Sequence, residues 1–228
     1  MNPGLSATSI NVCGILGGTF DPVHLGHVAL ADAALCALPL REVLWLPSGD
    51  PGHRASPVAS TEQRLAMLRL ATSGDPRFRI DAAELESNQP TYTVNSLARL
   101  RAQLGTRQPL VLLLGADSFL SLPTWLRWRE LFELAHIAVA DRPGHRADRP
   151  QMPEELAEEV ERRSASGERL AASAAGGIAR FDMPPLDISA SAVRAALAAG
   201  QDAAHLLPGA VLAYIETHRL YRKESHKP

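Results

Sequence analysis

Residues 14–27 constrain this chain more than any other stretch, because they join an apolar segment to a helical pattern through a turn with two glycines and two histidines. Residues 10–16 are apolar and partly β-branched, which predicts a buried strand that ends at the glycines. Apolar residues recur at helical spacing from Leu25 onward, so a helix should begin within 23–26. Its first turn therefore faces the glycines, and its free N–H groups and positive dipole end favour an anion.

The glycines and histidines of this turn predict a phosphate-binding site. Gly17 and Gly18 lack a Cβ, so the backbone can bend sharply and a ligand can approach its N–H groups. His24 and His27 lie three residues apart and should converge on one ligand, although either alone could simply cap the helix or lie on the surface. The turn is neither a Walker loop nor a G-x-G-x-x-G fingerprint. Two imidazoles without a P-loop lysine indicate chemistry at a phosphorus atom.

The run GGTFDPVHLGH over residues 17–27 resembles the signature of the H-x-G-H nucleotidyltransferase superfamily. Further matches, which together span residues 14–221, narrow the resemblance to the bacterial nicotinate-nucleotide adenylyltransferases. The resemblance implies that the opening motif binds ATP through Gly17, Gly18, Thr19, Phe20, His24 and His27.

Strand and helix patterns alternate along the chain, which predicts an α/β fold. Strands are expected over residues 43–46, 78–80, 110–114, 134–140 and 178–183, and the apolar run 110–114 should be central. With 228 residues, the chain suits one domain. We therefore predict a single Rossmann-like domain with a doubly wound, mainly parallel sheet and helices on both faces. Residues 154–163 should form a helix with a solvated charged face, and residues 164–177 an irregular connection.

Composition favours a small-molecule partner. The net charge is −2 and 21% of the residues are charged, so nothing in the bulk charge favours nucleic acid or an anionic membrane. Cys13 and Cys36 read as buried hydrophobic residues in a reducing compartment rather than as a disulfide or a metal site. The chain has no apolar run of about 18 residues, and residues 1–9 lack the pattern of a signal peptide. A cytoplasmic protein is expected.

Two segments supply candidate contacts for ATP beyond the opening motif. Gly115 and Asp117 follow the central strand, where an acidic residue commonly accepts hydrogen bonds from a ribose, although Asp117 could instead cap a helix. His53 and Arg54 lie in a loop after the second strand. The resemblance implies a P-P-H-K loop there, with its histidine and basic residue near phosphates, although exposed basic residues are commonly just solvated.

Three further segments resemble the family's nicotinate mononucleotide site. The T-Y-T segment at 91–93 implies contacts of Tyr92 and Thr93 with the nicotinate carboxylate, although Thr91 or Thr93 could simply cap the next helix. The match G-x-D-x-x-x-x-L-x-x-W implies that Trp125 stacks on the pyridine ring, while Trp128 is expected in the core. Arg142 follows a strand, and the resemblance implies that it binds a substrate phosphate. The alternative is an ion pair with Asp141 on the surface.

The segment ISASAVR at 188–194 resembles the family motif I-S-x-[ST]-x-[IV]-R. Ser189 should cap an Ala-rich helix whose early turns carry Arg194. The resemblance implies that Ile188, Ser189 and Arg194 bind the β- and γ-phosphates of ATP, which would bring this segment beside the opening histidines. Further along, Arg219 stands where the family's C-terminal G-L-Y pattern has glycine, and a structural effect is expected.

Together these motifs predict adenylyl transfer from ATP to nicotinate mononucleotide, with His24, His27 and Arg194 as catalytic residues. Mg²⁺ would bind through the ATP phosphates, with no dedicated protein cage. The alternatives are the same chemistry on nicotinamide mononucleotide or another phosphate acceptor such as phosphopantetheine, and a nucleotide-binding module without catalysis. The sequence leaves the choice between monomer and homodimer open.

Overall fold

A parallel sheet organises the fold, and the computed structural model describes it over residues 11–49, 56–87, 90–142 and 146–222. Its strand order is β3-β2-β1-β4-β5-β6, and every neighbouring pair is parallel. The strands are β1 (Val12–Gly18), β2 (Leu40–Pro47), β3 (Phe78–Ile80), β4 (Leu110–Gly115), β5 (His136–Asp141) and β6 (Ile178–Asp182). The predicted doubly wound α/β fold is confirmed.

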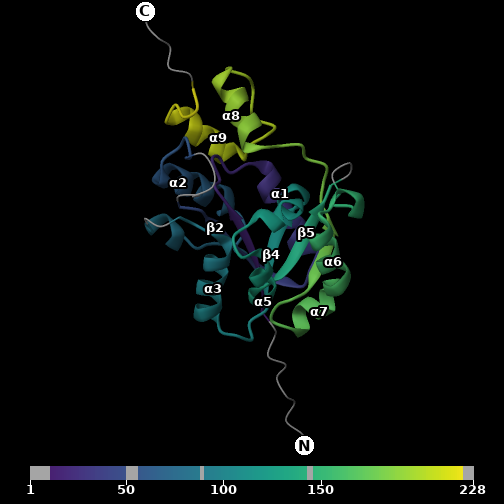
Figure 1. The fold of residues 1–228 in the computed structure, drawn as a ribbon. Helices are drawn as coiled ribbons and strands as arrows, with labels where there is room; N and C mark the ends of the chain where they lie inside the picture. Colours follow the sequence, from purple (N-terminus) through teal and green to yellow (C-terminus); the bar gives the residue numbers. More distant parts are fainter. Residues whose placement is uncertain (1–10, 50–55, 88–89, 143–145, 223–228) are drawn as a thin grey trace, which may run out of the picture.

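Helices cover both faces of the sheet (Figure 1). One face packs against α1 (Leu25–Ala37) and α2 (Thr61–Thr72), and α8 (Ala190–Ala198) and α9 (Gly209–Thr217) extend the same apolar cluster. The other face packs against α3 (Thr93–Leu104), α4 (Ala116–Leu120), α5 (Leu131–Leu134) and α6 (Glu154–Arg163). This two-sided cover is what the continuous apolar run of β4 requires: Leu110, Leu112 and Leu114 face one cluster, and Val111 and Leu113 face the other.

The first strand ends two residues later than predicted, so the two glycines do not form the turn. Gly17 and Gly18 belong to β1, where they pair with Leu46 and Pro47 of β2. Neither glycine has a positive φ; the left-handed residue of the turn is Phe20, with φ 50°, followed by a cis peptide bond at Asp21–Pro22. The chain therefore turns after the glycines, and the bend predicted at Gly17 and Gly18 is wrong.

Three local expectations were also wrong. The stretch 164–177 contains a helix, α7 (Gly167–Ala172), whose Leu170 is buried in the core. Cys13 is buried as predicted, but Cys36 is exposed on α1. The charged face of α6 is not wholly solvated, since Glu159 is buried against the guanidinium groups of Arg162 and Arg163.

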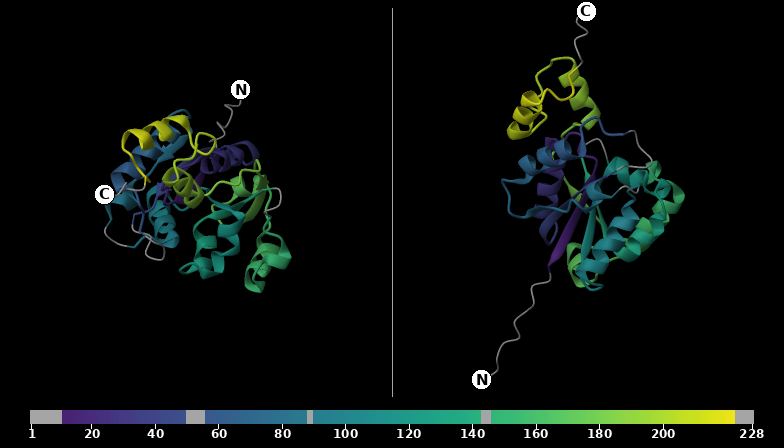
Figure 2. Two further views of the ribbon diagram at one scale, coloured as in Figure 1. Left: turned by 90° about the horizontal axis from the view of Figure 1, so that it is seen from above. Right: turned by 90° about the vertical axis from the view of Figure 1, so that its left-hand side faces the viewer.

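The C-terminal helices lie together at one end of the molecule, beyond the sheet (Figures 1 and 2). There α9 packs on α2, and the Leu206 carbonyl before α9 accepts a hydrogen bond from the Leu25 N–H at the start of α1. The segment before α9 therefore contacts the beginning of the first helix. Among the helices of the described ranges, none combines the length and apolar character that a membrane crossing needs.

Candidate active site

The carboxyl ends of β1 and β4 mark the point where the strand order reverses, and ligands of open α/β sheets bind in the crevice outside such a point. Gly17 is the second-last residue of β1 beside this point, and Gly115 is the last residue of β4. A Cβ built on either residue would meet nothing within 4 Å. Packing does not require glycine at these two positions, so the open space beside both backbones is available to a ligand.

His24 and His27 form a stacked pair at the start of α1. Their ring centroids lie 3.7 Å apart with an interplanar angle of 28°, so the two rings do project to one side as predicted. His24 is the N-cap residue, and its backbone N–H donates to Nδ1 of His27 at 3.2 Å. That bond requires an unprotonated Nδ1, so neutral His27 carries its proton on Nε2. The pair thus presents an imidazole N–H donor without a net charge.

Burial keeps both imidazoles neutral. His24 is 6% exposed, and burial lowers its pKa to about 4. Burial, together with repulsion from His24, lowers the pKa of His27 well below its ordinary value. His24 Nδ1 is buried and has no hydrogen-bond partner in the part of the chain described. An unsatisfied buried nitrogen of this kind is typical of functional sites.

The N-terminus of α1 is less open to an anion than expected. The Leu25 N–H is taken by Leu206, and the His27 and Val28 N–H groups both donate to the His24 carbonyl. The Gly26 N–H is left without a partner within the described residues. A Cβ at position 26 would lie 3.0 Å from His24 Nδ1, so glycine here lets the ring lie over the first turn.

The opening and closing motifs meet, as predicted. Arg194 Nη1 donates to the backbone carbonyl of Asp21 at 2.6 Å and lies 3.8 Å from its carboxylate. A Cβ at Gly26 would also lie 3.6 Å from Cβ of Ile188. Ser189 is the N-cap of α8, and its Oγ accepts from the Ala192 N–H at 3.1 Å. The capping role is therefore present, and the exposed Ser189 lies on the same element as Arg194.

Asp117 and Arg142 form a second link across the carboxyl edge. Their side chains approach to 3.6 Å, with Asp117 81% exposed and Arg142 mostly buried. Arg142 also donates to the Leu186 carbonyl at 2.8 Å, which ties β5 to the segment entering α8. Both alternatives to substrate binding are wrong: Gly115, not Asp117, caps α4, and Asp141 pairs with Arg180 rather than with Arg142.

The T-Y-T segment begins α3 beside the end of β2. Tyr92 is the N-cap residue and makes no side-chain capping bond, so the expected threonine cap is wrong; Thr93 is the first helical residue. The N–H groups of Thr93 and Val94 have no partner within the described ranges. At position 49 a Cβ would clash with the Glu84 carbonyl and touch Thr91 Oγ1 at 3.4 Å. The end of β2 is thereby fixed against this helix start, whose first two N–H groups have no partner among the residues that the structure describes.

The two tryptophans after β4 differ in burial. Trp128 is buried with an edge contact to Phe132 and the Arg129 guanidinium over its ring, as a core residue should be. Trp125 is half-buried and packs at the margin of the same cluster, which leaves part of its ring surface to solvent. The predicted division between a core and a stacking tryptophan agrees with these exposures. His53 and Arg54 lie outside the described residues.

A family match covers this whole arrangement. The cytidylyltransferase-like family model matches residues 15–196, which include the opening histidines, Asp117, Arg142 and the start of α8. The chain belongs to this family. The cytidylyltransferase-like match begins within β1 and ends within α8, so it contains both motifs that meet at Asp21.

Relatives with narrower names cover nearly the full chain. A protein of Dechloromonas aromatica (strain RCB), named probable nicotinate-nucleotide adenylyltransferase, is 50% identical over 210 residues, 92% of this chain and 97% of its own length. One of the same name from Pseudomonas putida (strain W619) is 44% identical over 216 residues, 95% and 97% of the two chains. The resemblance stated from the motifs is therefore confirmed at the level of the family.

A solved structure shares the fold. Plasmodium falciparum nicotinic acid mononucleotide adenylyltransferase complexed with APC has a TM-score of 0.67 at 18% identity, over 92% of this chain and 97% of that one. The same enzyme complexed with NaAD has a TM-score of 0.67 at 16% identity, over 92% and 97% of the two chains. The two chains therefore share this fold at low sequence identity.

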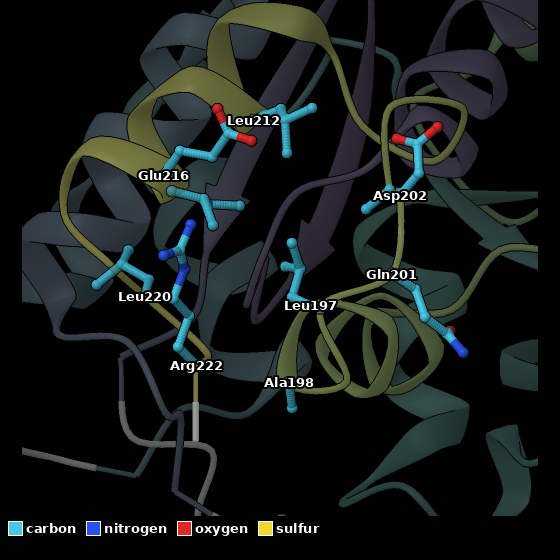
Figure 3. Close-up of a pocket in the computed structure, with 11 residues that line it drawn as sticks. Leu197, Ala198, Gln201, Asp202, Leu212, Glu216, Leu220 and Arg222 are labelled. Atoms are coloured by element: carbon cyan, nitrogen blue, oxygen red, sulfur yellow. The ribbon is translucent and has the colours of Figure 1, made fainter. Parts of the chain in front are cut away.

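One cavity lies apart from the predicted site. A hollow of about 430 Å³ opens between α8 and α9, with Leu197, Leu212 and Leu220 as apolar walls and Glu216 and Arg222 at its rim (Figure 3). None of the predicted site residues in the described ranges lines it. We therefore keep it separate from the candidate active site of this family member.

Sequence reasoning missed the residues that hold the site together. The Asp21 carboxylate accepts hydrogen bonds from Val58, Ala59 and Tyr221. Arg64 is 1% exposed, and its Nη1 donates to the carbonyls of Thr19 at 2.7 Å and Ser48 at 2.8 Å. The available signals were an Asp inside the opening motif and an Arg on the apolar stripe of a helix. Neither signal indicates which residues, distant in the sequence, would bind these side chains.

Proposed function

We propose that this protein transfers the adenylyl group of ATP to nicotinate mononucleotide, giving nicotinate adenine dinucleotide and pyrophosphate. The observation that carries the proposal is the meeting of the stacked histidines with α8, whose Arg194 is anchored on the Asp21 carbonyl. The activity agrees with the names of relatives at 44–50% identity over almost the whole chain.

The reaction is a single displacement at phosphorus. A phosphate oxygen of the mononucleotide attacks the α-phosphorus of ATP, a new P–O bond forms, and the bond to the β-phosphate oxygen breaks as pyrophosphate leaves. A phosphate monoester already carries a charge of about −1.5 to −2 at neutral pH, so no general base is needed. Positioning and charge stabilisation account for the rate.

The triphosphate lies between the opening and closing motifs in this proposal. The open backbone at Gly17 and the uncharged imidazoles of His24 and His27 contact the reacting phosphates, with Gly18, Thr19 and Phe20 shaping the turn. Neutral imidazole N–H groups can donate to the oxygens where charge develops. Ile188, Ser189 and Arg194 hold the departing pyrophosphate at the start of α8.

The mononucleotide lies toward β2 and β4. Trp125 offers its half-exposed ring to the pyridine, and the N–H groups at the start of α3, beside Tyr92 and Thr93, receive the carboxylate. Asp117 holds the ATP ribose beside Gly115, while Arg142, already fixed by Leu186, turns from Asp117 to the mononucleotide phosphate. His53 and Arg54 remain a proposed phosphate loop.

Mg²⁺ enters this scheme bound to ATP. Within the described residues, no group of three or more His, Cys, Asp or Glu side chains could hold a metal ion. Asp21, the acid within the opening motif, already accepts three hydrogen bonds. Mg²⁺ keeps several waters and commonly binds through substrate phosphates, where it would neutralise developing charge. A cytoplasmic location stays a prediction.

Turnover with the acid and the amide mononucleotide tests the proposal. Purified protein with Mg–ATP should release pyrophosphate rapidly with nicotinate mononucleotide and much more slowly with nicotinamide mononucleotide. Equal or inverted rates would mean that the carboxylate is not selected. Turnover with phosphopantetheine but not with either mononucleotide would change the acceptor. If none of the three acceptors gives pyrophosphate release, the protein is a nucleotide-binding module without catalysis.

A further inference from the structure

The proposed function gives no role to Tyr221, although its phenol lies beside the site. Tyr221 Oη donates to Asp21 Oδ1 at 2.7 Å, and the two residues are 9% and 4% exposed. Burial raises the pKa of the phenol, so the hydroxyl stays protonated and donates. The same carboxylate accepts the N–H groups of Val58 at 2.7 Å and Ala59 at 3.1 Å. Buried carboxylates are stable when paired in this way.

The chain after α9 is folded so that Tyr221 reaches Asp21. Arg219 and Tyr221 both adopt left-handed backbone conformations, with φ 53° and 59°, and the Leu220 N–H donates back to the Ile215 carbonyl. Leu220 and Arg222 line the cavity between α8 and α9 (Figure 3), whereas Tyr221, between them, is buried against Asp21. Two residues in an unfavourable backbone region indicate that the position of this side chain is strongly determined by its surroundings.

Asp21 in turn determines where the Arg194 guanidinium lies. Nη1 of Arg194 donates to the Asp21 carbonyl at 2.6 Å and lies 3.8 Å from Oδ2, while Nη2 makes a longer bond to Ser191 Oγ at 3.4 Å. Arg64, a buried cation, interacts electrostatically with Asp21 and donates to the backbone at the ends of β1 and β2. Displacement of the Asp21 carboxylate would therefore weaken its ion pair with Arg194 and disturb the main-chain carbonyl of the same residue, which makes the shortest contact of Arg194.

We propose that Tyr221 is a positioning residue for adenylyl transfer: by holding the Asp21 carboxylate, it fixes the Arg194 guanidinium at the triphosphate. The inference rests on the proposed function, because that function places Arg194 on the departing pyrophosphate. The remaining N–H groups of Arg194, which have no partner within the described residues, stay free for phosphate oxygens.

A double-mutant cycle tests this chain of contacts. Tyr221→Phe keeps the ring and removes the hydroxyl, and it should lower kcat/KM for ATP about tenfold, as the loss of one hydrogen bond would, with KM for nicotinate mononucleotide unchanged. In an Arg194→Ala background the same substitution should have no further effect, because the group it positions is absent. Tyr214→Phe on α9, the matched control, should match the wild type.

The outcomes separate the inference from the function on which it rests. If Arg194→Ala reduces turnover and Tyr221→Phe has either no effect or the same effect in both backgrounds, the positioning role is overturned. If wild-type protein does not turn over nicotinate mononucleotide, or Arg194→Ala retains full activity, the proposed function fails instead. Urea unfolding establishes that each variant is folded in the assay. Should Tyr221→Phe be unfolded there, Asp21→Asn replaces it in the same cycle and is judged by the same two criteria.

Discussion

The imidazole rings of His24 and His27 stack 3.7 Å apart, and the backbone N–H of the first donates to the ring of the second. A protonated pair could not keep this arrangement, because Nδ1 of His27 would lose its acceptor lone pair and the two rings would repel each other. The observed arrangement of the pair therefore requires both imidazoles to be neutral, which affects the predicted stability and the proposed catalysis.

Stability should fall as the pH drops below the ordinary pKa of histidine. Burial lowers the pKa of His24, His27 and His136 in the folded state, so the unfolded chain binds more protons between about pH 6.5 and pH 4. The free energy of unfolding should decrease toward acid by about 1 kcal/mol per pH unit for each such histidine. Urea unfolding at pH 7, 6 and 5 measures it.

The His27→Asn variant isolates the contribution of the pair, since the amide oxygen can still accept from the His24 N–H. Its stability profile should be shallower than that of the wild type over the same pH range. A wild-type profile that is flat from pH 7 to 5 would contradict the prediction.

Replacing His24 or His27 with alanine should affect turnover far more than stability. Removing one donor from a charge-stabilising site costs about 100- to 1000-fold in kcat, whereas loss of one partly stacked ring should cost no more than about 2 kcal/mol of unfolding free energy. Pyrophosphate release and urea unfolding of the same preparations give both numbers. Full adenylyl transfer by both single variants would rule out the catalytic assignment.

Alanine substitutions of Trp125 and Trp128 should have opposite effects on stability and on substrate binding. Trp128→Ala should cost about 3–5 kcal/mol of stability, because the ring is buried against Phe132. Trp125→Ala should leave the unfolding midpoint nearly unchanged and raise KM for nicotinate mononucleotide about tenfold, the worth of one aromatic stacking contact. The reverse pattern, with Trp128 controlling KM, would show that the two roles are exchanged.

Arg219→Gly should stabilise the protein. Arg219 adopts φ 53°, a region that costs a residue with a Cβ about 1–2 kcal/mol, and the substitution relieves that cost. The gain should be about 1 kcal/mol, a rise in Tm of about 2–4 °C for a chain of this size. Calorimetry checks the shift, and adenylyl transfer should be unaltered. A lower Tm would mean that the arginine side chain contributes more than its backbone strain costs.

Local patterns in the sequence predicted the parts of the fold that local physics decides. The apolar run of β4 and the capping role of Ser189 were readable because each depends on neighbours in the chain. The short helix α7 was missed because its small residues carry little periodicity. Cys36 was misplaced because α1 is apolar on most sides, so composition did not distinguish its exposed face.

The scaffold of the site was harder to predict because it is non-local. Motif residues such as His24 and Arg194 could be assigned from the chain, and their meeting could be expected. Asp21 binds groups 37, 38 and 200 positions away, and no short pattern encodes such partners. Arg64 lies on α2, and its guanidinium joins two strand ends that are far from it in the sequence.

The close approach of Gly49 to the Glu84 carbonyl limits how this enzyme could be altered. Main chain meets main chain there, so no choice of larger residue could be accommodated by side-chain repacking alone. A library that varies the proposed mononucleotide site can therefore sample Tyr92 and Trp125 while position 49 is held constant. Widening the pocket from the β2 side would require redesign of the turn η1 (Ala83–Glu86) as well.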